Sequence, residues 1–148
     1  LHAFNQWLDE EWGFAYQDRL IAVPMLSLAD PQAAVAEIDW LDHSLFHLDG
    51  PGALRHLDTL LQIPKLGGIQ WVPGANTGPM LQWLPVLRRV QAAGKLLHLS
   101  VDADEVEPLL RELRPEGLCL HTSVGSEEEA QELLKMAARM TRSGGHGE

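Results

Sequence analysis

The 148-residue sequence has few cysteines, few basic residues and no long apolar run, and each shortage excludes a class of protein. Its one cysteine, Cys119, excludes an intramolecular disulfide framework and fits a reducing, cytoplasmic compartment. Acidic residues outnumber basic ones by 21 to 11, and the resulting net charge of -10 disfavours nucleic acid and anionic membranes as partners. No run approaches the roughly 18 apolar residues that span a bilayer, and the opening residues lack the features of a signal peptide.

The composition is nevertheless that of a globular domain, because 45% of the residues are hydrophobic and 22% are charged. A chain of this length can bury one sizeable core, so we expect residues 1–142 to form a single α/β domain. The tail SGGHGE, residues 143–148, consists of glycine and polar residues, and we expect it to be disordered.

Short apolar runs alternate with segments of helical periodicity along the chain. An amphipathic helix is expected near residues 4–16, and each later helical segment follows a run typical of a strand. Asp30-Pro31 has the pattern of a helix start, while Ser126 and Glu129 have that of a capping box. The last helix is expected to turn Ala130, Leu133, Leu134 and Ala137 inward. The five expected strands are residues 19–26, 44–50, 67–74, 95–101 and 117–124.

Five consecutive β-α units predict a parallel sheet, because parallel strands require long crossovers and these crossovers are helical. A closed eight-stranded barrel needs about 200 residues or more, so the chain would hold only part of one. Two architectures fit, a partial TIM barrel and an open flavodoxin-like sheet, each with an N-terminal helix. Both architectures expose the edges of the sheet, and a barrel-like curve also exposes an apolar face. Either a homodimer or the opening helix, with Trp7 and Trp12, would cover these surfaces.

Three stretches between residues 41 and 142 carry a family resemblance: LDHSLFHLDGPGALRHLDTLLQIPKLGGIQWVPGA, LQWLPVLRRVQAAGKLLHLSV and LHTSVGSEEEAQELLK. They resemble the C-terminal part of the uroporphyrinogen decarboxylase-like superfamily, which includes methyltransferases that act with corrinoid proteins. The resemblance implies a β/α barrel and either decarboxylation or methyl transfer. The tetrapyrrole-binding residues of the decarboxylase come largely from an N-terminal half that these stretches do not include, so we do not expect decarboxylation from this chain alone.

The first 40 residues have a different resemblance. The stretch NQWLDEEWGFAYQDRLIAVPMLSLADPQAAVAEIDWL is similar to part of the decarboxylase-like metal-dependent amidohydrolases, which are also eight-stranded barrels. Together the two resemblances imply a chimera, recombined or engineered, with a seam near residues 40 and 41. Amidohydrolase metal sites begin with a His-x-His pair, which this sequence lacks. Zinc-binding methyltransferases of the other family use a His-x-Cys pair and a later cysteine; here His47 matches the histidine, but Asp49 and Val124 stand in place of the cysteines.

Strand alternation places a candidate metal site among the expected strands. Side chains two residues apart face the same way, so those of His47, Asp49, His98 and His121 would project toward one region. Three imidazoles and one carboxylate suit zinc, whose bound water attacks carbonyl or phosphate esters. The structural alternative is that Asp49 accepts backbone N–H bonds in the turn or caps the next helix, the histidines bond backbone carbonyls, and Cys119 is a small core residue between leucines.

Two functions are compatible with these features. The first is a structural, self-associating barrel fragment, with no cofactor and no catalytic activity of its own. The second is a metal-binding enzyme or a module for an undefined small-molecule ligand, with zinc held by the four candidate ligands. The missing half of the barrel, the seam and the altered family ligands favour the first function, and no catalytic residue is assigned.

Overall fold

A computed structural model shows that the chain divides into two compact units, Leu1–Asp42 and His43–Glu148. The structure describes residues 1–13, 15–16, 20–21, 23–27, 29–41 and 43–142. The seam expected near residues 40 and 41 lies beside the boundary between the units. The single domain expected over residues 1–142 stays a prediction, and the tail expected to be disordered lies outside the described residues.

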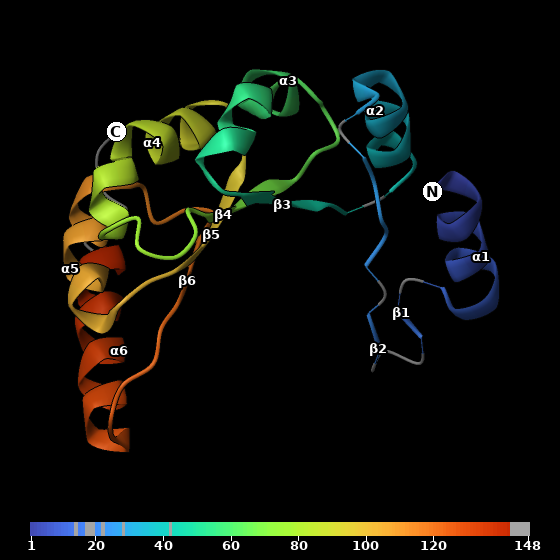
Figure 1. The fold of residues 1–148 in the computed structure, drawn as a ribbon. Coiled ribbons are helices and arrows are strands. Elements are labelled where there is room, and N and C mark those ends of the chain that lie inside the picture. The colour runs from blue at the N-terminus through green and yellow to red at the C-terminus, as the bar shows by residue number, and fades with distance from the viewer. Residues whose placement is uncertain (14, 17–19, 22, 28, 42, 143–148) are drawn as a thin grey trace. The chain divides into compact units, whose positions relative to one another are not determined.

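The first unit contains two helices and a short antiparallel hairpin (Figure 1). Asp30 begins the second helix as predicted, since its Oδ1 accepts hydrogen bonds from the backbone N–H groups of Gln32 and Ala33, both at 3.1 Å. Pro31 fits the first turn, where its missing N–H costs nothing. The elements of this unit are α1 (His2–Trp12), β1 (Ala15–Tyr16), β2 (Leu20–Ile21) and α2 (Pro31–Trp40).

The strand expected over residues 19–26 does not extend the parallel sheet. Leu20–Ile21 pairs antiparallel with Ala15–Tyr16, and residues 23–27 form no strand. Pro24 explains the interruption, because proline has no backbone N–H to donate to a strand ladder. Arg19 and Ala22, which belong to the same expected strand, lie outside the described residues.

The second unit is built on a parallel sheet of four strands in the order β3-β4-β5-β6. Four of the five expected strands therefore form as predicted, and the expectation of five parallel strands is not met. The strand order equals the chain order, so right-handed crossovers place successive helices on the same face of the sheet. The strands are β3 (Leu45–Asp49), β4 (Gly68–Val72), β5 (Leu96–Ser100) and β6 (Leu118–His121).

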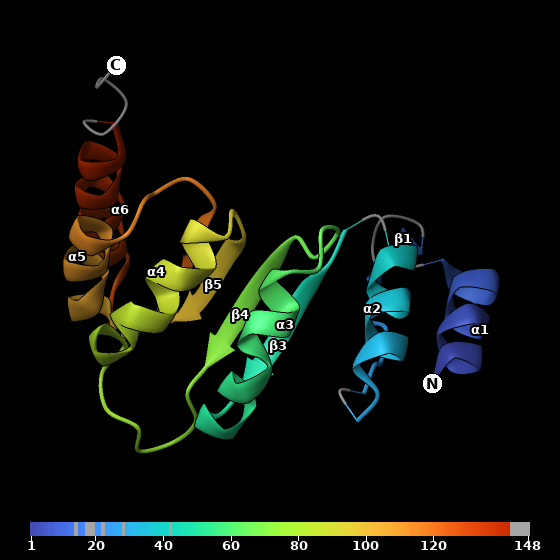
Figure 2. The same cartoon turned by 90° about the horizontal axis from the view of Figure 1, so that it is seen from above.

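Helices follow each strand of the second unit, and Figures 1 and 2 show α3, α4 and α5 over one face of the sheet. After β4 the α-helix starts at Leu84, behind a short 3-10 helix, and Pro85 lies in its first turn, where no backbone N–H is needed. The helical elements are η1 (Pro51–His56), α3 (Leu57–Leu61), η2 (Met80–Trp83), α4 (Leu84–Ala92), α5 (Ala103–Glu112) and α6 (Glu127–Arg142).

The face of the sheet beneath these helices holds the core of the second unit. Trp71 of β4 is 1% exposed and meets Trp83 edge-on, with 5.1 Å between the ring centroids. Trp71 is therefore a core residue, whereas Trp83 is half-buried. Other fully buried side chains come from alternate strand positions and the facing helices: Leu48, Ile69, Leu97, Leu99, Leu57, Leu60, Leu87, Val90 and Leu109. Their removal from water is the main stabilising contribution to this unit.

Candidate functional site

Among the described residues of the second unit, no helix covers the opposite face of the sheet. Its row nearest the amino ends of the strands is apolar, because Leu45, Gly68 and Leu96 are paired in register across β3, β4 and β5. The two leucines are 51% and 52% exposed. A hollow of about 690 Å³ lies here, and His98, Gly117 and Cys119 are also among its lining residues. We call this side of the sheet the open face.

The middle row of the open face is polar. His47, Gln70, His98 and Cys119 are paired in register across all four strands. Nδ1 of His47 lies 2.7 Å from Oε1 of Gln70, and the amide oxygen accepts this hydrogen bond when Nδ1 carries the proton. Gln70 was missed by sequence reasoning, because a single glutamine in an apolar run gives no sign of the histidines beside it.

The third row lies at the carboxyl ends of the strands. Asp49 pairs with Val72, and Ser100 pairs with His121. A cavity of about 820 Å³ opens beyond this edge, lined by the loop of residues 73–79, the first turn of α5 and the segment after β6. Ligands of parallel α/β proteins bind at this end of the sheet, so the cavity and the open face together form the candidate site.

Within this cavity Glu105 has a structural contact that the sequence did not suggest. The side chain is 9% exposed, and its Oε1 accepts a hydrogen bond from the backbone N–H of Leu81 at 3.1 Å. This bond connects α5 to η2. It also gives a partner to the N–H of Leu81, which lies at the start of η2 and would otherwise have none within that helix. Asp102 is the N-cap residue of α5, although its side chain makes no capping hydrogen bond.

The four predicted metal ligands share the open face but are not gathered at one point. His98 lines the hollow at the amino ends, His121 lines the cavity at the carboxyl ends, and His47 and Asp49 line neither. Across the described ranges of the chain, no three His, Cys, Asp or Glu side chains lie close enough together to hold a metal ion. Zinc binding by these four residues stays a prediction.

The structure differs from the structural alternatives at three residues. Cys119 is exposed and not a core residue, because Leu118 and Leu120 take the alternate positions that face the helices. Asp49 does not cap the helix after β3, since Gly50 holds the N-cap position and no side chain caps that helix. His47 bonds a side-chain amide, and not the backbone carbonyl that had been expected for it.

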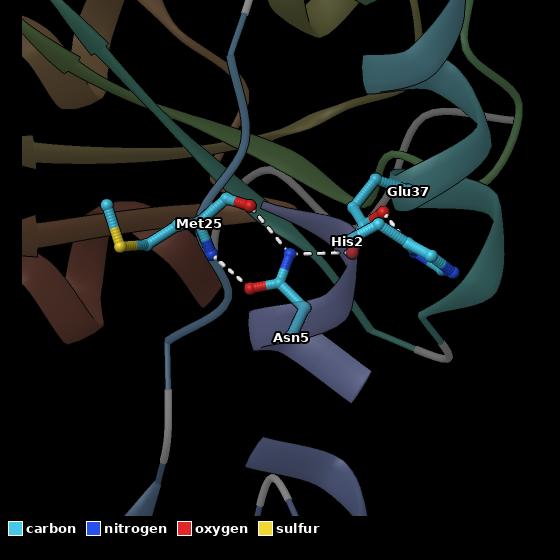
Figure 3. A network of polar contacts seen from close by, with 4 residues as sticks. All are labelled: His2, Asn5, Met25 and Glu37. Atoms are coloured by element: carbon cyan, nitrogen blue, oxygen red, sulfur yellow. Dashed lines mark hydrogen bonds and ion pairs between the residues drawn. The ribbon is translucent and has the colours of Figure 1, made fainter. Parts of the chain in front are cut away.

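The first unit contains a separate polar network, shown in Figure 3. Asn5 is fully buried, and its amide donates to the carbonyl oxygen of Met25 and to Oε1 of Glu37, both at 2.6 Å. The Met25 N–H donates to Oδ1 of Asn5 at 2.8 Å, and Nδ1 of His2 lies 2.8 Å from Oε2 of Glu37. The network joins α1, α2 and the segment before α2.

Opposing effects act on the pKa of Glu37. Burial raises this pKa, but the hydrogen bonds from Asn5 and His2, together with the positive charge of His2, outweigh burial. The pKa of Glu37 therefore lies below its ordinary value, and the carboxylate is the stable form in the folded unit. Sequence analysis missed this network, because Asn5 and Glu37 are separated by 32 positions and belong to no motif.

In the ranges that the structure describes, no helix is both long and apolar enough to cross a membrane. Comparison of the chain with protein-family models, with curated proteins and with solved structures gives no match. The resemblances stated above therefore rest on the quoted stretches alone.

Proposed function

We propose that this chain is a self-associating segment of a β/α barrel, with a structural role and no catalytic activity of its own. The observation that carries the proposal is the open face, where Leu45 and Leu96 are each about half exposed. Parallel sheets are almost always covered on both faces, since their strands must bury apolar side chains on each side. A second copy of the chain would supply the missing cover.

The sheet topology supports a barrel segment over an open flavodoxin-like sheet. A flavodoxin-like sheet changes strand order at one point and carries helices on both faces. Here the strands are ordered as in the chain, from β3 to β6, and the face opposite the open face is the buried one. In a barrel the open face would point inward, toward the packed interior.

The distribution of charge favours a second copy as the occupant of the open face. The chain carries a net charge of -10, so two copies repel each other through most of their surfaces. On the strands of the open face Asp49 is the only residue with a carboxylate, and the other polar residues are histidine, glutamine, serine and cysteine. Two open faces can therefore approach each other with little repulsion.

The division into two units supports a recombined or engineered origin. The boundary between Asp42 and His43 lies next to the seam inferred from the two resemblances. A unit that keeps its own hydrogen bonds can be joined to another chain without loss of its packing. The network of Asn5 and Glu37 lies wholly within the first unit.

Light scattering of the full chain over a concentration series tests self-association. We expect a mass above the 16.4 kDa of one chain, and a lower mass at equal concentration for Leu96→Lys and Leu45→Lys. Ala92→Lys adds the same charge at an exposed position of α4 and should leave the mass unchanged. Circular dichroism verifies that each variant is folded. A wild-type monomer at every concentration would refute the proposal.

A zinc-binding module is the second candidate, because His47, Asp49, His98 and His121 project from the same open face. Elemental analysis of protein equilibrated with zinc and then desalted is the test. This candidate predicts bound zinc that His47→Ala removes, whereas His56→Ala, at the end of η1, leaves the content unchanged. Equal zinc in both variants and in the wild type, or no zinc in the wild type, would exclude it.

A further inference from the structure

The last helix, α6, is only partly covered by its own unit. None of the 16 residues of α6 is buried, although α4 and α5 each have buried residues. The helix packs against α5, and Ala130, Leu133 and Ala137 are half-buried, as their spacing predicted. Leu134 had also been expected to face inward, but it is 69% exposed, because it lies at the margin of the apolar stripe.

Charges on α6 are divided by sign along the helix. Its first half carries Glu127, Glu128, Glu129 and Glu132, and its second half carries Lys135, Arg139 and Arg142. This order suits the helix dipole of a single α6. It also makes the helix complementary to an antiparallel copy of itself, since the acidic half of one then meets the basic half of the other.

We infer that α6 pairs antiparallel with α6 of a second copy, about a two-fold axis that passes near Leu134. Leu134 and Lys135 are the middle residues of the helix, so the axis brings the two exposed leucines together. Glu127 then faces Arg142 of the second copy, and the reverse contact occurs on the other side of the axis. A parallel pair would instead oppose like charges at both ends.

This contact rests on the proposed self-association but uses a different surface from the open face. The two surfaces can therefore be separated by substitution. Leu96→Lys places a charge in the open face, disrupts the contact there and leaves α6 intact, so the full-length Leu96→Lys chain reports on the helix contact. We expect this chain to retain a concentration-dependent dimer.

Sedimentation measurements on that chain test the arrangement of the helices. Adding Arg142→Glu places like charges opposite Glu127 and should raise the dimer dissociation constant roughly tenfold, since two symmetric pairs are lost. Adding Glu127→Arg as well restores opposite charges and should restore the parent dissociation constant. Glu116→Arg is the matched control, because it reverses an exposed charge between α5 and β6.

The possible outcomes separate this inference from the proposed function. A Leu96→Lys chain that is wholly monomeric while the wild type associates would refute the helix contact and leave the proposed function standing. The same conclusion follows if Arg142→Glu has no effect, or if the double reversal binds no better than Arg142→Glu. A wild-type chain that never associates would refute both. Helix content by circular dichroism confirms that each variant keeps α6.

Discussion

Replacing Asn5 with alanine should destabilise the first unit more than any change on its surface. Asn5 makes one hydrogen bond to the Glu37 carboxylate and two to the backbone of Met25. A hydrogen bond to a charged group contributes about 1.5–3 kcal/mol and a neutral one about 1 kcal/mol. Water can replace part of the bonds to Met25, which is more exposed than Asn5, so we expect a loss of about 3 kcal/mol.

Amide hydrogen exchange of α1 and α2, followed by mass spectrometry, measures this loss locally. A loss of about 3 kcal/mol corresponds to roughly 100-fold faster exchange of the amides that open with the unit. Gln6→Ala changes the next residue of α1, which is exposed, and should alter exchange only slightly. Less than threefold faster exchange in Asn5→Ala would show that the network does not hold the unit together.

Three further substitutions test the sheet and the network. Gly68→Ala should lower the melting temperature, because the new Cβ would lie 2.8 Å from the Cβ of Leu96 and 2.9 Å from the carbonyl oxygen of Leu96. Gly52→Ala should leave the melting temperature unchanged, because no atom lies within 4 Å of the new Cβ. Leu99→Ala should cost about 3 kcal/mol in urea unfolding, since Leu99 is 0% exposed, whereas Leu96→Ala should cost far less. The lowered pKa of Glu37 stabilises the folded unit above about pH 4.5, and this contribution disappears as the pH falls through the folded pKa. Glu37→Gln should therefore lose less stability than the wild type between neutral and acid pH, and an equal loss would contradict the assignment.

The helix starts that sequence reasoning predicted correctly are fixed by local contacts. Asp30-Pro31 begins α2. Ser126 Oγ accepts the N–H of Glu129 at 3.2 Å, as a capping box requires, although the carboxylate of Glu129 reaches the N–H of Gly125 and not that of Ser126. Each of these signals lies within four residues of the structure it determines, so the sequence alone carries it.

The errors concern positions whose surroundings come from distant segments. Strand periodicity gives the alternation of side chains but not which side the helices cover, so Cys119 was assigned to the core and is exposed. The run of residues 19–26 has the apolar composition of a strand, yet among its described residues only Leu20 and Ile21 pair with a neighbouring strand. For the candidate site, alternation correctly placed His47, His98 and His121 on one face, but only the register and the cavities show that His98 and His121 line different hollows and that His47 lines neither.

The match between strand order and chain order has a consequence for folding kinetics. Each strand of the second unit pairs with the strand before or after it in the chain, so each pairing closes a loop that holds one helical crossover and its connections. Pairings between consecutive strands favour faster folding than pairings between more distant segments. The sheet can grow from β4 and β5 outward, one strand and helix at a time, and loss of an end strand leaves the earlier pairings intact.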